Sequence, residues 1–148
     1  MHLFVVHRHL FCENRMNEMV KQPTLLMIGN DDRLGYLLTR FAEQSGFRLV
    51  RQPYAPWIGE VRQTRPSALI FASLEQLQSA QSLVEDLSGL DVPIFACVAL
   101  ADEARARECG ADACLVHPLT FESFLAVLAG NGLATRYPYP SQKGEETP

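Results

Sequence analysis

Ala68-Leu69-Ile70-Phe71-Ala72 is the stretch of sequence that decides the fold. An apolar run of this length, preceded by Pro66 and followed by Ser73, is typical of a short strand that is covered on both faces. Strands buried in this way belong mostly to parallel sheets, and parallel strands need long crossover connections. The run therefore predicts a central strand with helices on both sides of its sheet.

The alternation of apolar runs and helical stripes continues in both directions from this strand. The expected strands are residues 24–28, 47–50, 68–72, 93–98 and 114–116. Between them lie apolar stripes at helical spacing, over residues 34–42, 57–61, 77–87 and 121–128, and a short polar helix over 102–109. This order predicts an α/β fold with a doubly wound, five-stranded parallel sheet in a single domain. In such sheets ligands and chemistry gather at the carboxyl ends of the strands.

Composition agrees with one globular domain in the cytoplasm. The chain has 148 residues, of which 47% are hydrophobic and 20% charged. Its net charge of -4, without a block of Lys or Arg, predicts neither a nucleic-acid nor a membrane-surface partner. No apolar run reaches the roughly 18 residues of a membrane helix.

The ends of the chain differ from its middle. We place the domain at residues 23–131 and interpret residues 132–148, rich in Pro and polar residues, as a flexible tail. Residues 1–22 are interpreted as a leader: a disordered segment, a short partner-docking helix, or the product of a misplaced start upstream of Met16 or Met19.

The four cysteines form no CxxC pair and have no histidine at metal-ligand spacing. We therefore expect reduced thiols, no metal and no cofactor. Cys97 and Cys114 are expected on neighbouring strands, either as small apolar side chains of the core or as an oxidant-sensing pair.

Two segments carry a resemblance to a known family. Gly110-Ala111-Asp112-Ala113-Cys114-Leu115-Val116-His117-Pro118 resembles the receiver-domain pattern Gly-Ala-Asp-x-Tyr-Leu-x-Lys-Pro, and residues 65–71 resemble the Arg-Pro-Asp-led third strand of that family. With the order of elements, the resemblance to response-regulator receivers of the chemotaxis type covers about residues 23–130. It implies the flavodoxin-like (βα)5 fold and a role in two-component-type signalling.

The resemblance also implies where the phosphorylation site of such a domain would lie, and every position there departs from the pattern. Gly29 and Asn30 stand at the acidic pair, Ala72 at the phosphoacceptor with Ser73 next to it, Val98 at the Thr/Ser, Cys114 at the switching aromatic, and His117 at the lysine. Alanine has no nucleophilic carboxylate, and Gly-Asn cannot supply the anionic oxygens that Mg²⁺ prefers. Histidine is mostly neutral at pH 7, so it is a poor substitute for a fixed cation. We therefore expect a degenerate receiver that is not an enzyme.

Several of these residues keep two interpretations. Asp31 and Asp32 could hold a metal after a one-position shift, or cap the first helix. Ser73 could accept a phosphate from a separate kinase, or cap a helix. His117 could respond to pH, or be hydrogen-bonded at the edge of the pocket. Trp57 could anchor a partner, or pack on the sheet.

The sequence thus favours a phosphorylation-independent receiver-like module that acts by binding protein: a sensor kinase, an output domain, or a second copy in a homodimer. The resemblance implies the face made by the fourth helix, fifth strand and fifth helix, where Arg105, Arg107 and Glu108 are rim charges or merely solvated. One alternative is a small-molecule or redox sensor that uses the vacated pocket. Another is an atypical phosphoacceptor with displaced acids.

Overall fold

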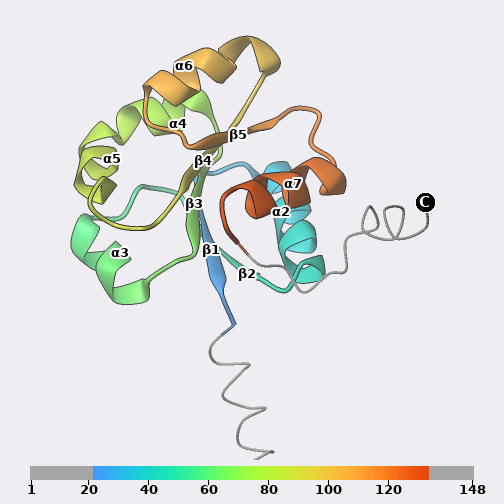
Figure 1. Cartoon of the computed structure of the whole chain (residues 1–148), viewed down its shortest axis with the longest axis horizontal. Helices are drawn as coiled ribbons and strands as arrows, with labels where there is room; N and C mark the ends of the chain where they lie inside the picture. The colour runs from blue at the N-terminus through green and yellow to red at the C-terminus, as the bar shows by residue number, and fades with distance from the viewer. Residues whose placement is uncertain (1–21, 134–148) are drawn as a thin grey trace, which may run out of the picture.

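The computed structural model describes residues 22–133, which form one parallel sheet with helices on both faces (Figure 1). The strand order is β2-β1-β3-β4-β5, the flavodoxin-like order that the sequence predicted. The strands are β1 (Thr24–Ile28), β2 (Arg48–Gln52), β3 (Ala68–Phe71), β4 (Ile94–Val98) and β5 (Ala113–Val116). Nearly all of the expected leader and tail lies outside the described residues.

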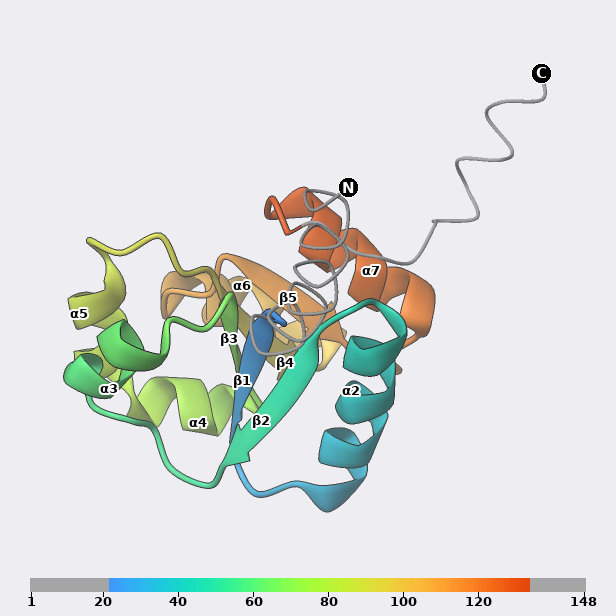
Figure 2. The same ribbon diagram turned by 90° about the horizontal axis from the view of Figure 1, so that it is seen from below.

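The helices divide unequally between the two faces of the sheet. They are α2 (Asp32–Gln44), α3 (Ile58–Thr64), α4 (Leu74–Ser79), α5 (Gln81–Leu87), α6 (Glu103–Glu108), which follows the 3-10 turn η1 (Leu100–Asp102), and α7 (Phe121–Gly130). α2 and α7 cover one face, and α3 to α6 cover the other (Figure 2). No helix within residues 22–133 is both long enough and apolar enough to cross a membrane.

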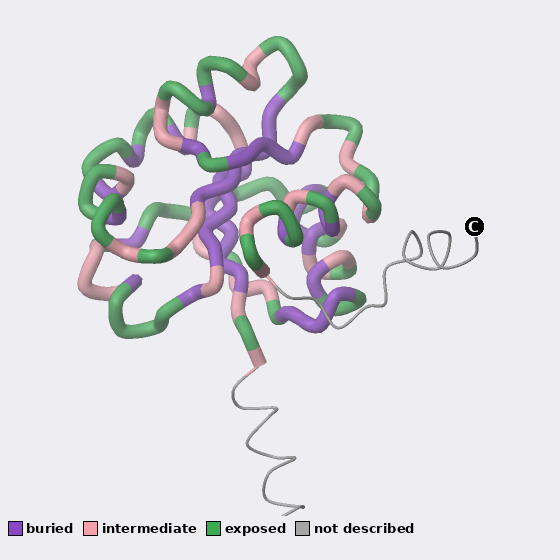
Figure 3. Tube along the Cα trace, in the orientation of Figure 1, coloured by how far each residue is buried: buried purple, intermediate pink, exposed green. Residues whose placement is uncertain are grey.

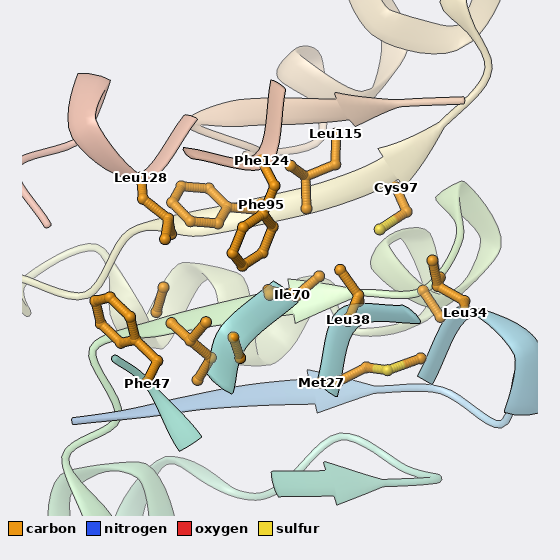
Figure 4. Packing of buried hydrophobic residues seen from close by; sticks show 14 of the residues in the cluster. Met27, Leu34, Leu38, Phe47, Ile70, Phe95, Cys97, Leu115, Phe124 and Leu128 are labelled. Carbon is orange, nitrogen blue, oxygen red and sulfur yellow. The ribbon is translucent and has the colours of Figure 1, made fainter. Parts of the chain in front are cut away.

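Alternating side chains of the central strands build two apolar clusters. On β1, Leu25 and Met27 point toward α2 and α7, whereas Leu26 and Ile28 point toward the other helices. Figure 4 shows the first cluster, in which Phe124 of α7 packs over the sheet. The middle of the sheet is buried throughout (Figure 3), so these apolar strands supply the main stabilising term of the fold.

The Gly-Ala-Asp segment has a structural role. Gly110 has φ +110°, and a Cβ there would lie 2.5 Å from Cγ1 of Val84 on α5. Ala111 is buried. Oδ2 of Asp112 accepts a 2.7 Å hydrogen bond from the N–H of Ile94, whose carbonyl accepts one of 2.7 Å from the N–H of Asp112. The segment therefore fixes the approach of β5 to the start of β4.

Helix ends and breaks partly follow the prediction. The last helix begins with a capping box, in which Thr120 and Ser123 satisfy each other's backbone N–H groups. The stripe over residues 77–87 belongs to two helices, not one, because the chain leaves helical geometry at Ala80 (φ -112°, ψ 29°). Trp57 precedes α3 with 70% of its surface exposed, so the expectation that it packs on the sheet is wrong.

Candidate functional site

The positions that the sequence marked lie together at the carboxyl edge of the sheet. Ile28 at the end of β1 is paired with Phe71 at the end of β3, and the N–H of Ala72 donates to the Ile28 carbonyl at 2.9 Å. On the other side, the N–H of His117 donates to the Val98 carbonyl at 3.0 Å. The loops that follow the strands therefore form one edge, as expected for a parallel sheet.

Gly29 and Ala72 are in close contact at the centre of this edge. Gly29 has φ +138°, a conformation that residues with a side chain rarely adopt. A Cβ at Gly29 would lie 2.5 Å from the Cβ of Ala72, closer than two such atoms approach in proteins. The two positions that would carry a metal ligand and a phosphoacceptor by the resemblance thus make a close apolar contact, with no oxygen on either side chain.

The acids that follow Gly29 are engaged in local structure. Asp31 is the N-cap of α2, where its Oδ1 accepts the N–H of Leu34 at 3.0 Å, so the capping interpretation is confirmed for this residue. Asp32 is the first residue of α2 and forms a 2.9 Å ion pair with Arg51 of β2. Asn30 is exposed.

Arg51 is the residue of this region that the sequence did not single out. Its guanidinium lies on the backbone of Gly35 in α2, since a Cβ there would be 2.4 Å from Cζ of Arg51. Because Gly35 has no side chain, the guanidinium can pass over this part of α2 and donate a hydrogen bond to Asp32, one turn earlier on the same face. Predicting this contact requires the register of β2 against β1 and the position of α2, which no local pattern contains.

The residues of this edge do not fit Mg²⁺. That ion needs near-octahedral oxygen ligation with at least one or two carboxylates. Asp31 caps a helix, Asp32 is paired with a cation, and the positions nearest the strand ends are glycine and alanine. Across residues 22–133, no three His, Cys, Asp or Glu side chains are grouped in a way that could hold a metal ion.

Replacing Asp31 by alanine is expected to lower the free energy of unfolding by about 1 kcal/mol, because the N–H of Leu34 loses its acceptor. Asp31→Asn, which keeps an oxygen acceptor, should retain most of the stability. Asp32→Ala should cost less than about 1 kcal/mol, because its carboxylate is exposed. Urea unfolding of the three variants measures the difference, and equal losses for Asp31→Ala and Asp32→Ala would contradict the capping role.

The other marked positions hold a helix-capping hydroxyl, two buried side chains and an exposed imidazole. The hydroxyl of Ser73 caps α4 by accepting the N–H of Gln76 at 3.2 Å, which confirms its capping interpretation. Val98 and Cys114 are buried. His117 is exposed, and within the described part of the chain its ring forms no hydrogen bond, so the expectation of a hydrogen-bonded histidine is wrong.

Cys97 and Cys114 lie on neighbouring strands, as expected, but on opposite faces of the sheet. Cys97 belongs to the cluster under α2 and α7, and Cys114 to the cluster under the other helices. Burial raises the pKa of the Cys97 thiol to about 12, with a smaller contribution from the charge of Asp31. Burial also raises the pKa of Cys114, and Arg107 opposes that shift. Both thiols are therefore held in their unreactive, protonated form.

Alkylation of the folded protein at pH 8 should therefore modify Cys109 before Cys97 and Cys114. Cys109 is half-buried, whereas the other two are buried and have raised pKa values. Peptide mapping by mass spectrometry after iodoacetamide treatment measures the order, and the same reaction in urea is the control. A disulfide between Cys97 and Cys114 on mild oxidation would contradict this arrangement.

The three charges of the expected interaction face lie on α6. All three side chains are exposed. Arg107 pairs with Glu103 at 3.6 Å and donates to the carbonyl of Asp112 at 3.1 Å. Arg105 and Glu108 form no ion pair with another described residue.

Several known structures with the same architecture are described as receiver domains or response regulators. A response regulator receiver protein from Burkholderia phymatum superposes with a TM-score of 0.58 at 21% identity, covering 78% of this chain and 99% of that one. A protein described as a response regulator from Chloroflexus aurantiacus gives a TM-score of 0.59 at 19% identity, with 74% and 97% covered. The BeF3-activated receiver domain of RstA from Klebsiella pneumoniae gives 0.57 at 17% identity, with 73% and 97% covered.

At these identities the similarity defines the fold, and the chain has the receiver-domain fold. Neither a protein-family model nor a curated protein matches the sequence.

Proposed function

We propose that this protein is a receiver-like module of two-component-type regulation that works without phosphorylation, in the cytoplasm, by binding another protein. The observation that carries the proposal is the contact between Gly29 and Ala72, which fills the place of the acid and the phosphoacceptor with glycine backbone and a methyl group. A receiver fold without these groups keeps only its surfaces for transmitting a signal.

Engagement of the nearby acids supports the same proposal over an atypical phosphoacceptor. To serve as nucleophile or metal ligand, Asp31 would have to release the N–H of Leu34, and Asp32 would have to leave Arg51. Freeing a helix cap costs about 1 kcal/mol, and among residues 22–133 no third His, Cys, Asp or Glu joins these two acids in a group that could hold a metal.

The redox alternative loses support from the opposite orientation of Cys97 and Cys114. The alternative of a ligand in the vacated pocket loses support from the Gly29–Ala72 contact, which leaves no room between the two positions. Both alternatives require a reactive group or a cavity at the edge of the sheet.

Treatment with acetyl phosphate or beryllofluoride and Mg²⁺ tests phosphorylation independence. We expect no acid-labile phosphoryl group, no change in Trp57 emission and no shift of backbone amide signals. The RstA receiver domain, whose structure was determined in its BeF3-activated form, is the positive control. Stoichiometric labelling of Asp31, Asp32 or Ser73 would overturn the proposal.

Light scattering with size-exclusion chromatography distinguishes self-association from a monomer that binds a different protein. If a homodimer uses the α6–β5–α7 face, Arg105→Glu should shift the equilibrium between monomer and dimer, because Arg105 is exposed and unpaired there among the described residues. A dimer that is insensitive to this charge reversal would place the contact elsewhere.

A further inference from the structure

A groove of about 700 Å³ lies between β2 and α3. Leu26, Val50 and Val61 form its apolar part, and Arg48 and Arg65 contribute cations. The groove is distinct from the carboxyl edge described above and from the α6 surface. Figure 2 shows that β2 is an edge strand of the sheet. Helix α3 lies on the face of the sheet opposite to α2.

The outer edge of β2 offers free backbone groups. The N–H of Arg48 donates to the Pro23 carbonyl, and the carbonyl of Gln52 accepts the N–H of Gly29, so these two residues face inward. Since backbone direction alternates along a strand, the N–H and C=O groups of Leu49 and Arg51 face outward. No other strand of residues 22–133 pairs with that side, and no residue of β2 is buried.

The groove is positively charged in a chain that is negative overall. Arg48 and Arg65 are exposed, and neither forms an ion pair with another described residue. Glu60 is the single acid among the described residues that line the groove, whereas the net charge of the chain is -4. Arginines at β2 alone could serve only to discourage edge-to-edge pairing of copies. Arg65, however, lies at the end of α3 and reaches the same groove from the other side.

The backbone at Arg65 adds to this argument. Its φ of +50° is a left-handed conformation, which costs a residue with a side chain about 1–2 kcal/mol and is usually occupied by glycine after a helix. A long cation is therefore held at a position where the fold alone favours glycine. Strained residues of this kind gather at binding sites.

Two exposed aromatic residues lie in the loop between β2 and α3, where Trp57 lines a separate pocket beside α5. Tyr54 and Trp57 are 81% and 70% exposed, on either side of Pro56, which lines the groove. Tyr, Trp and Arg are the residues that most often dominate binding energy in protein interfaces. A groove with an apolar floor and two arginines, beside a strand edge that no other strand of residues 22–133 pairs with, has the composition of a peptide-binding site.

We infer that the β2–α3 groove binds an extended, acidic segment of a partner protein, added as a strand to the outer edge of β2. Side chains at every second position of the segment would face the groove. Its carboxylates there would pair with Arg48 and Arg65, and an apolar side chain on the same face would pack on the half-buried Val50. The inference rests on the protein-binding part of the proposed function and gives it a site and a partner chemistry. Two free cations beside Glu60 are too few for the repeated phosphate contacts of a nucleic acid.

Selection of displayed random decapeptides on the immobilised full-length protein tests the inference. We expect enrichment of peptides that carry both acidic and apolar residues at every second position, because only one face of the added strand meets the groove. The double variant Arg48→Glu/Arg65→Glu should weaken the selected peptides by at least about tenfold, since it replaces attraction by repulsion. Arg33→Glu/Arg40→Glu has the same charge change on two exposed arginines of α2, outside the groove and the α6 surface, and it should alter affinity by less than about twofold.

Binding geometry is measured separately by amide hydrogen exchange. The selected peptide should slow exchange at Leu49 and Arg51 in particular, and the same peptide N-methylated at alternate residues should bind poorly. Trp57, the single tryptophan of the chain, reports binding by its emission.

Three results would overturn the inference: no enriched peptide, enriched peptides that bind both double variants equally, or single-stranded nucleic acid that competes for the groove with higher affinity. Any of these would leave the phosphodonor experiment unaffected, so failure of the groove and failure of phosphorylation independence remain distinguishable.

Discussion

Gly29→Asp is expected to lower the free energy of unfolding by about 3 kcal/mol and to create no Mg²⁺ site. Residue 29 must adopt φ +138°, which is strained for aspartate, and its Cβ must enter the space of the Ala72 methyl group. Placing at this position the carboxylate that the resemblance implies is therefore expected to destabilise the fold without supplying a metal ligand. Urea unfolding and calorimetric titration with Mg²⁺ measure both effects.

Three control variants separate the causes. Gly29→Ala introduces the backbone strain and the Cβ contact without a charge. It should account for most of the loss in the free energy of unfolding that Gly29→Asp causes. Gly89→Ala adds a methyl group where no atom lies within 4 Å, and it should change stability by less than about 0.5 kcal/mol. Asn30→Asp, at an exposed residue, should also be close to neutral. A Gly29→Asp protein as stable as the wild type, with tight Mg²⁺ binding, would show that the edge of the sheet is still open to this chemistry.

Gly110→Ala is expected to cost about 2 kcal/mol. The added methyl group meets Cγ1 of Val84 at 2.5 Å, and the residue has φ +110°. In a Val84→Ala background the steric part should disappear while the backbone part remains, so the cost of Gly110→Ala should fall by about half. Thermal unfolding of the four proteins in this cycle provides the measurement, and an unchanged cost would exclude the contact as its source.

Much of the fold could be predicted because its strongest signals are local. Apolar runs identified the strands, and the apolar stripe over residues 121–128 identified α7. Residues 77–87 were predicted as one helix because no Gly or Pro marks the interruption at Ala80. The exposure of Trp57 was missed because the expected stripe over residues 57–61 includes it, whereas α3 begins at Ile58 and leaves Trp57 outside the helix.

The sequence predicted which residues lie at the carboxyl edge of the sheet, but not which atoms they contact. The sequence identified which groups are missing at Gly29 and Ala72, yet the left-handed backbone and the close approach of the two residues depend on packing between strands. Cys97 and Cys114 were correctly placed on neighbouring strands, but their opposite orientation depends on register, which pairs Cys114 with Ala96. The pairing of Asp32 with Arg51 likewise requires three-dimensional information.

The resemblance that the sequence displays is concentrated in residues that hold the fold together. Gly110 permits the turn into β5, Ala111 is part of the core, and Asp112 binds the first amide of β4. None of these roles depends on phosphorylation. Such residues are necessary for folding whatever groups stand at the edge of the sheet, so the pattern and an edge with glycine and alanine can occur in one chain.

The side chain of Arg51 has a further consequence for the loop after β1. A positive charge that is covalently attached to the neighbouring strand balances Asp32, so this loop carries its own counterion. A chelator cannot remove such a cation, and the metal content of the solution does not set its occupancy. The loop is thereby linked to β2 by the polypeptide itself, with a strength that rising salt reduces because the Asp32 carboxylate is exposed.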